Sequence, residues 1–222
     1  MKTAIVIGAT GLIGKHLTKL LLDDPAYSSV KVFVRRTLNI SNPKLVELIV
    51  DFDNITDWKN KITGDELYSA MGTTIKKAGS KEAQYKIDVT YQYEFAKAAS
   101  ENRVKGYFLV SSSGANVKSK LFYMRIKGEL EEKVRLLSFN KIRIFRPPLL
   151  LGERDEKRFG EKAAERLLKI VVPLFSFLKN QRPIEGEKVV RAMIVSTNET
   201  DTERIKIFEP KEIFNLAEKL SN

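Results

Sequence analysis

Three residues near the middle of the chain have the types and spacing for proton transfer: Ser112, Tyr123 and Lys127. The Tyr-x-x-x-Lys spacing places the phenol and the ammonium one helical turn apart on one face of a helix. Lys127 is then a nearby cation that makes the Tyr123 phenol a usable proton donor or acceptor, and it also suits a ribose hydroxyl. A facing serine hydroxyl would bind a substrate oxygen as hydride arrives at or leaves the adjacent carbon. Ser112 is the first choice for that serine and Ser111 the second.

The spacing alone is weak, because three of the seven tyrosines satisfy it: Tyr27/Lys31, Tyr93/Lys97 and Tyr123/Lys127. Tyr123 differs in its context, since it begins an expected helix over 122–137 and follows a strand that ends in Ser-Ser-Ser-Gly. A helix that returns antiparallel to the strands has its first turn at their carboxyl edge. The alternative is that Tyr123 packs in the core and that the serines merely end a strand.

A glycine-rich turn follows the first apolar run and opens the first expected helix. Such a turn lets the backbone approach a pyrophosphate closely, and the free N–H groups and the helix dipole then hold the anion. The turn therefore predicts a dinucleotide site, with a plain strand-to-helix turn as the alternative. The residues expected to bind the cofactor there are Gly8, Thr10, Gly11, Leu12, Ile13 and Gly14.

Arg35 and Arg36 end the second expected strand, where an NAD-binding unit usually carries an acidic residue for the ribose hydroxyls. Two guanidinium groups there suit a 2′-phosphate, which they bind through charge-assisted, bidentate hydrogen bonds. We therefore expect NADP(H) rather than NAD(H). The alternative is a solvated strand end.

The elements that position these residues alternate between strand and helix. Apolar runs predict strands at 3–7, 30–34, 46–50, 67–70, 107–110 and 142–145, and helical spacing predicts helices at 12–22, 82–100 and 122–137. This order predicts an α/β fold with a doubly wound, mainly parallel sheet of the Rossmann type and a ligand beyond the carboxyl ends of the strands.

The pattern changes after residue 148. Amphipathic segments follow at about 157–178 and 188–196, then a strand at 205–208 and a helix from 210. We expect one NAD(P)-binding domain over residues 1–222, in which about 149–222 form a short elaboration on the substrate side.

Composition narrows the chemistry. The chain has 222 residues, no cysteine and one histidine, which excludes disulfides, a cysteine nucleophile and multi-histidine metal sites, so no metal is expected. No apolar run is long enough for a membrane span and the N-terminus does not resemble a signal peptide, so a cytoplasmic location is expected. The net charge of +11 favours an anionic ligand.

Several segments together resemble the short-chain dehydrogenase/reductase superfamily: IVIGATGLIG, VFVRR, AMGTTIKKAGS, LVSSSGANVKSKLFYMRIKGELEEKV and IFRPPLLLGER. More narrowly, the chain is similar to the atypical group that includes Tat-interactive-protein-like and nucleoside-diphosphate-sugar epimerase-like members. The resemblance implies that Met71 and Gly72 line the nicotinamide side and that Leu150 covers it. It also implies that Asp51 meets the adenine and that Arg158 approaches a phosphate.

The chain departs from the sugar epimerases in two respects. The interval between Ser112 and Tyr123 is short, and the tail is too short for a nucleotide-sugar lobe. The leading expectation is therefore an NADP(H)-dependent oxidoreductase that acts on a small carbonyl or alcohol. A second is an NADPH-binding sensor that acts through a protein partner with little turnover. A third, binding of nucleic acid through the positive charge, lacks a matching motif.

Overall fold

The computed structural model describes residues 1–151, 182–199 and 202–219. Seven strands form one sheet in the order β3-β2-β1-β4-β5-β6-β9, and every neighbouring pair is parallel. This confirms the doubly wound α/β fold that the sequence predicts. The strands are β1 (Lys2–Ile7), β2 (Tyr27–Val34), β3 (Leu45–Ile49), β4 (Glu66–Ser69), β5 (Gly106–Val110), β6 (Lys141–Phe145) and β9 (Ile205–Phe208).

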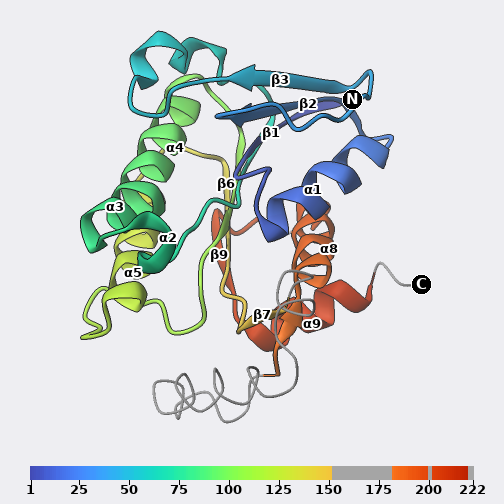
Figure 1. The fold of residues 1–222 in the computed structure, drawn as a ribbon. Coiled ribbons are helices and arrows are strands. Elements are labelled where there is room, and N and C mark those ends of the chain that lie inside the picture. Colours follow the sequence, from blue (N-terminus) through green and yellow to red (C-terminus); the bar gives the residue numbers. More distant parts are fainter. Residues whose placement is uncertain (152–181, 200–201, 220–222) are drawn as a thin grey trace, which may run out of the picture.

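Helices cover both faces of the sheet (Figure 1). The residues of β1 explain this arrangement, because Ala4 and Val6 pack into the apolar cluster on one face of the sheet, and Ile5 and Ile7 pack into the cluster on the other face. A strand buried on both faces carries an unbroken apolar run rather than an alternating one. One face is covered by α1 (Leu12–Asp23), α8 (Gly186–Thr197) and α9 (Pro210–Glu218), the other by α3 (Lys81–Tyr85), α4 (Tyr91–Glu101) and α5 (Phe122–Arg135).

The helix expected over 82–100 consists of three pieces. Between α3 and α4 the backbone forms a π-helix over Lys86–Thr90. Such a turn holds more residues than an α-turn and interrupts the 3.6-residue period, so the apolar pattern did not predict it. It carries a fully buried carboxylate, Asp88.

Two small features complete the described fold. A two-stranded parallel sheet pairs β7 (Leu150–Leu151) with β8 (Ile184–Glu185), and a short helix, α2 (Ile75–Ala78), follows the loop after β4. The expected segment at 157–178 lies outside the described residues, as does Arg158. No helix in the described ranges combines the length and the apolar character that a bilayer span requires.

Candidate functional site

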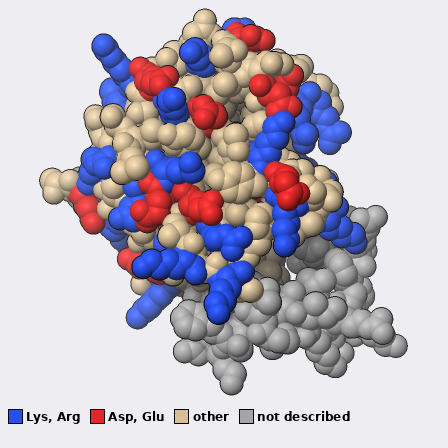
Figure 2. Space-filling model, turned by 90° about the vertical axis from the view of Figure 1, so that its left-hand side faces the viewer, with Lys and Arg blue, Asp and Glu red and all other residues tan. Residues whose placement is uncertain are grey.

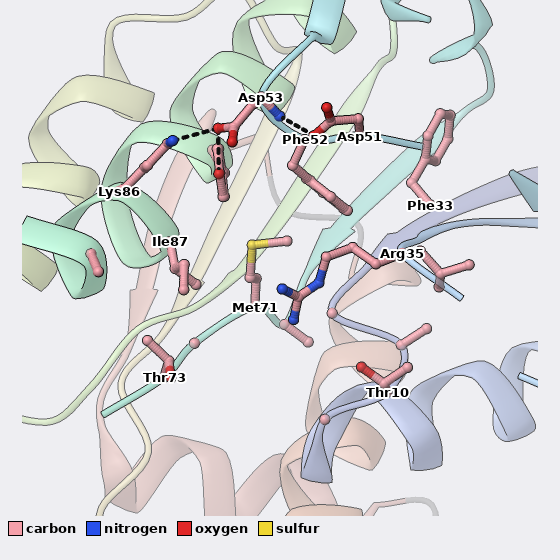
Figure 3. A pocket seen from close by; sticks show the side chains of 18 residues that line it. Thr10, Phe33, Arg35, Asp51, Phe52, Asp53, Met71, Thr73, Lys86 and Ile87 are labelled. Atoms are coloured by element: carbon pink, nitrogen blue, oxygen red, sulfur yellow. Dashed lines mark hydrogen bonds and ion pairs between the residues drawn. The ribbon is translucent and has the colours of Figure 1, made fainter. Parts of the chain in front are cut away.

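A cavity of about 490 Å³ opens beyond the carboxyl ends of β1, β2, β3 and β4. The loop after each of these strands contributes to its wall, and the π-helix region closes one side (Figure 3). In the sheet, β2 and β3 follow on one side of β1, and β4, β5, β6 and β9 follow on the other side. The strand order therefore reverses between β1 and β4, and doubly wound folds bind ligands at such a switch point. The lining residues are 8–11, 33–35, 51–53, 70–73, Ala83, Lys86, Ile87 and Tyr91.

The glycine turn forms the floor of this cavity. Gly8 has a φ of +84°, and a Cβ added there would lie 2.5 Å from the carbonyl carbon of Ala70. A Cβ at Gly14 would lie 2.0 Å from the Gly8 carbonyl oxygen, so α1 can approach β1 closely only without that atom. Gly11 is the N-cap of α1 and supplies no side-chain hydrogen bond. The turn therefore fits a dinucleotide, because the first-turn N–H groups have no capping side chain.

The predicted cofactor residues divide into two sets. One set lines the cavity: Gly8, Thr10, Gly11, Arg35, Asp51, Met71 and Gly72. The other set does not: Ile13 is buried in the core, Gly14 packs beneath Gly8, and Leu12, Arg36 and Leu150 lie outside the lining.

Arg35 is a cation inside this cavity, and its side chain points toward Met71 (Figure 3). Within the described part of the chain it forms no ion pair. The neighbouring carboxylate of Asp53 is already engaged, because Lys86 lies 2.6 Å away and the Tyr91 hydroxyl donates to it at 2.5 Å. These two hydrogen bonds lower the pKa of Asp53. Arg35 is thus the cavity cation left to a ligand.

Sequence reasoning missed the far wall of the cavity, which includes Phe52, Asp53, Lys86 and Tyr91. Tyr91 and Lys86 lie in a helical stretch, and no motif marks which of its faces meets the loop after β3. The aromatic contact between Phe52 and Tyr91, with ring centroids 5.7 Å apart, fixes that face.

Lys127 is buried beside the cavity, with only 3% of its side chain exposed. Its Nζ lies 2.9 Å from Asp88 Oδ1, and a Cβ added at Gly72 would lie 3.8 Å from that Nζ. Burial opposes the charge of Lys127, but the Tyr123 phenol, Asp88 and Glu131 outweigh it and raise its pKa. The ammonium is therefore held charged just behind the cavity wall.

Asp88 is a functional candidate that the sequence did not reveal. Its other oxygen accepts a hydrogen bond from the Thr73 backbone N–H at 3.0 Å, so the same carboxylate fixes the loop after β4. The signal available was an acid between Ile87 and Val89 within an apolar stretch. Such a residue is rarely fully buried without a partner.

Tyr123 lies on α5 one turn before Lys127, and its ring centroid is 5.8 Å from the Lys127 Nζ. It remains 39% exposed and is not among the residues that line the cavity. Of this pair only Lys127 points fully inward, because Tyr123 belongs to the first turn of α5, where the helix emerges from the packed core.

The two candidate serines have different surroundings at the end of β5. The Ser111 hydroxyl is buried and donates to Glu131 at 2.5 Å, and Arg146 binds the same carboxylate through two nitrogens. The Ser112 hydroxyl is half-buried, and within the described ranges its only hydrogen-bond contact is a long one of 3.4 Å with the Ser113 carbonyl oxygen. Ser111 is thus engaged in a structural network, whereas Ser112 is available to a ligand.

The tyrosines of the other two Tyr-x-x-x-Lys pairs contact side chains away from the cavity. Tyr27 is buried and donates to Glu66, a carboxylate that also accepts from Tyr68. Tyr93 receives the Lys133 ammonium 5.1 Å from its ring centroid. Groups of three or more residues suited to a metal ion are absent from the described ranges.

Comparison with known proteins identifies the family. A family model described as "NAD(P)H-binding" matches residues 8–141. Protein fmp52, mitochondrial, from Emericella nidulans is 34% identical over 201 residues, covering 87% of this chain and 86% of the relative. The Eremothecium gossypii protein of that name is 34% identical over 221 residues and 97% of each chain, and the Candida albicans protein is 40% identical over 171 residues, 74% of this chain and 75% of its own.

Solved structures with this fold include a short-chain dehydrogenase/reductase superfamily protein from Agrobacterium tumefaciens with bound NAD. It has a TM-score of 0.71 at 14% identity and covers 94% of this chain and 77% of its own. The ADP-L-glycero-D-manno-heptose-6-epimerase of Helicobacter pylori has a TM-score of 0.68 at 17% identity, with coverages of 98% and 81%.

The relatives also correct one expectation. The predicted cytoplasmic location is wrong, because the relatives that match most of the chain are named mitochondrial proteins. The lack of cysteine did not distinguish the two compartments. The chain belongs to the NAD(P)H-binding family of Rossmann-type domains and, through these relatives, to the Fmp52 family.

Proposed function

We propose that the chain is an NADP(H)-dependent oxidoreductase that interconverts a small carbonyl compound and its alcohol. The observation that carries the proposal is the position of Lys127. Its charged Nζ lies behind Gly72, a residue of the cavity wall, and within 5.8 Å of the Tyr123 ring centroid. A proton-transfer pair thus adjoins a cavity whose glycine floor suits a dinucleotide.

The cofactor would be held by the groups that line the cavity. The N–H groups of the glycine turn suit its pyrophosphate, Asp51 and Phe52 its adenine, and Met71 and Gly72 its nicotinamide end. When bound, the nicotinamide supplies or accepts a hydride.

The preference for NADP(H) rests on Arg35. A guanidinium without a carboxylate partner among the described residues, aimed into the cavity at the end of β2, suits a 2′-phosphate. Arg36 is exposed outside the lining, so we assign it the smaller part.

The three residues of the chain divide the remaining chemistry. Ser112 donates a hydrogen bond to the substrate oxygen and polarises the carbon–oxygen bond. Tyr123 gives a proton to that oxygen during reduction and takes it back during oxidation. Lys127 stabilises the phenolate, and Asp88 keeps Lys127 in place. Residues from about 149 onward complete the substrate side. The Ser113 N–H bond to the Pro147 carbonyl at 2.9 Å supports this, because it ties the residues just before that segment to the end of β5.

Replacing Tyr123 with phenylalanine tests the proposal, with NADPH oxidation followed at 340 nm across a panel of carbonyl compounds. We expect the rate to fall about 10²- to 10⁴-fold while NADPH affinity persists, because general acid catalysis contributes that much. Tyr93→Phe is the matched control, since Tyr93 has the same Tyr-x-x-x-Lys spacing on another helix, and it should keep full activity. Equal rates in the Tyr123 variant and the control would refute the chemistry.

A second function is favoured by one observation, the 39% exposure of Tyr123 outside the cavity lining. On this alternative the protein binds NADPH, turns over little and reports the cofactor's redox state to a protein partner. Tight NADPH binding without turnover across the panel would support it. For either function we propose a mitochondrial location, as the names of the Fmp52 relatives suggest.

A further inference from the structure

Six cations lie in two short segments, one that begins at Gly72 beside Lys127 and one that contains Tyr123, and we call these six cations the basic rim. Segments 72–82 and 114–125 contain these six cations and one acid, Glu82, whereas the whole chain has 39 basic and 28 acidic residues. Figure 2 shows basic side chains gathered on the lower part of the face formed by α2, α3 and α5. The basic rim comprises Lys76, Lys77, Lys81, Lys118, Lys120 and Arg125.

Among the residues that the structure describes, the basic rim has few neutralising partners. Its five lysines are exposed, and none of them forms an ion pair with a carboxylate of the described residues. Elsewhere, lysines such as Lys86 and Lys206 lie within 3.0 Å of an acid. Arg125 has a distant acid, with Glu129 at 3.8 Å. Uncompensated like charges repel one another, so this concentration favours an anionic ligand.

The first segment of the rim is anchored to the proposed catalytic pair. The Thr73 N–H bonds to the Asp88 carboxylate, and the Thr73 carbonyl accepts from Gln84 at 3.0 Å. Helix α2, with Lys76 and Lys77, begins two residues after Thr73. Its position is therefore fixed by the same carboxylate that holds Lys127.

The second segment wraps the beginning of α5. The Asn116 N–H bonds to the Met124 carbonyl at 3.0 Å, and a Cβ at Gly128 would lie 2.4 Å from the Val117 nitrogen. Close packing of the loop on α5 thus requires that glycine. The Phe122 ring, next to Tyr123, has Lys81 and Arg125 each 5.7 Å from its centroid and so joins the two segments.

Resting on the proposed function, we infer that the substrate carries an acid group, a carboxylate or a phosphate, that the basic rim binds while the carbonyl lies at Ser112 and Tyr123. The acid group takes no part in the bond changes and supplies orientation and attraction. Orientation of this kind lowers the entropic part of the barrier. A nucleic acid is disfavoured because the cations flank a half-exposed phenol beside a cavity rather than a continuous groove.

The test compares 4-carboxybenzaldehyde with benzaldehyde at saturating NADPH. We expect the charged aldehyde to have a kcat/KM at least tenfold higher. The variant Lys118→Glu/Lys120→Glu should lower that ratio roughly tenfold, a few-fold for each reversed charge. Raising ionic strength should lower the ratio in the native chain, because exposed charges are screened.

Lys59→Glu/Lys61→Glu is the matched control, with the same change of charge in exposed residues. The Lys59 carbonyl accepts from Asn102, at the end of α4 remote from the cavity, so this variant should keep the native ratio. A ratio near one in the native chain, or equal losses of the ratio in both variants, would overturn the inference while leaving the proposed function intact.

If neither these two aldehydes nor any other compound of the carbonyl panel is turned over, the proposed function fails and binding decides the inference. Calorimetric titration of terephthalate into the NADP-loaded protein should then show binding that the rim variant loses and the control keeps. Absence of that difference overturns the inference. A different result would be that phosphatidylglycerol vesicles capture the native chain but not the rim variant, while the enzyme does not discriminate between the aldehydes. That result assigns the basic rim to a lipid surface and also overturns the inference.

Discussion

Replacing Asp88 with asparagine removes the negative charge from the buried pair and keeps the side-chain size. Asp88 and Lys127 are 0% and 3% exposed and lie 2.9 Å apart, so the variant leaves a buried ammonium without its ion-pair partner. Breaking a buried pair in this way costs about 3–5 kcal/mol of unfolding free energy. Urea denaturation at pH 7 measures this loss. Glu132→Gln, in an exposed pair with Arg135, is the control and should cost under about 1 kcal/mol.

The pH dependence of the unfolding free energy lost in Asp88→Asn is a more specific test. In the native chain the pKa of Lys127 is raised above 10.5, so its contribution to stability is complete below that value and declines as pH rises through the folded pKa. Without Asp88, its charge and its hydrogen bond no longer raise this pKa, burial still lowers it, and only Tyr123 and Glu131 continue to raise it. The pKa of Lys127 should therefore be lower in the variant than in the native chain, and the stability lost by the variant should shrink as pH rises from 7 toward 10. A loss no larger than that of Glu132→Gln, or one independent of pH, would refute the buried-pair reasoning.

Three further predictions concern the cofactor cavity and the core. Gly8→Ala should lower the unfolding free energy by about 2–5 kcal/mol in urea denaturation and weaken NADPH binding, because a clash of about 1–3 kcal/mol adds to the cost of a positive φ. Gly79→Ala is the control, because Gly79 has a φ of +95° and nothing within 4 Å of an added Cβ. It should lose only the cost of the positive φ, about 1–2 kcal/mol. Arg35→Ala should weaken NADPH roughly tenfold or more in a fluorescence titration and leave NADH nearly unchanged, whereas Arg36→Ala should alter either affinity by under threefold. Glu66→Gln should lower the unfolding free energy by about 1–3 kcal/mol in urea denaturation, because its carboxylate accepts from two buried phenols; an unchanged midpoint would contradict this.

The sheet and the cavity floor were predictable from local signals. Continuous apolar runs mark strands buried on both faces, and a turn that needs glycine where φ is positive, as at Gly8, is visible in the residue types. The positions of Met71 and Gly72 followed from the resemblance to known families. Each of these features depends on residues close together in the sequence or on a motif that the chain shares with known families.

The partners of the candidate site were not predictable, because they depend on tertiary contacts. Asp88 meets Lys127 across two packed helices, and the π-turn that presents it leaves no mark in the hydrophobic period. The engagement of Ser111 by Glu131, which separates it from Ser112, likewise joins a strand end to a helix 20 residues further on. Two adjacent serines therefore have different hydrogen-bond partners because of packing alone.

Strand β9 is the last strand of the sheet in sequence order, and it pairs with β6, some 60 residues earlier in the chain. During synthesis the edge of β6 that pairs with β9 has no strand partner until residues 205–208 have left the ribosome. An open strand edge is a template for pairing with other chains, so the nascent chain is vulnerable to aggregation until β9 arrives. A carboxy-terminal truncation that removes residues from 205 onward would make that transient vulnerability permanent.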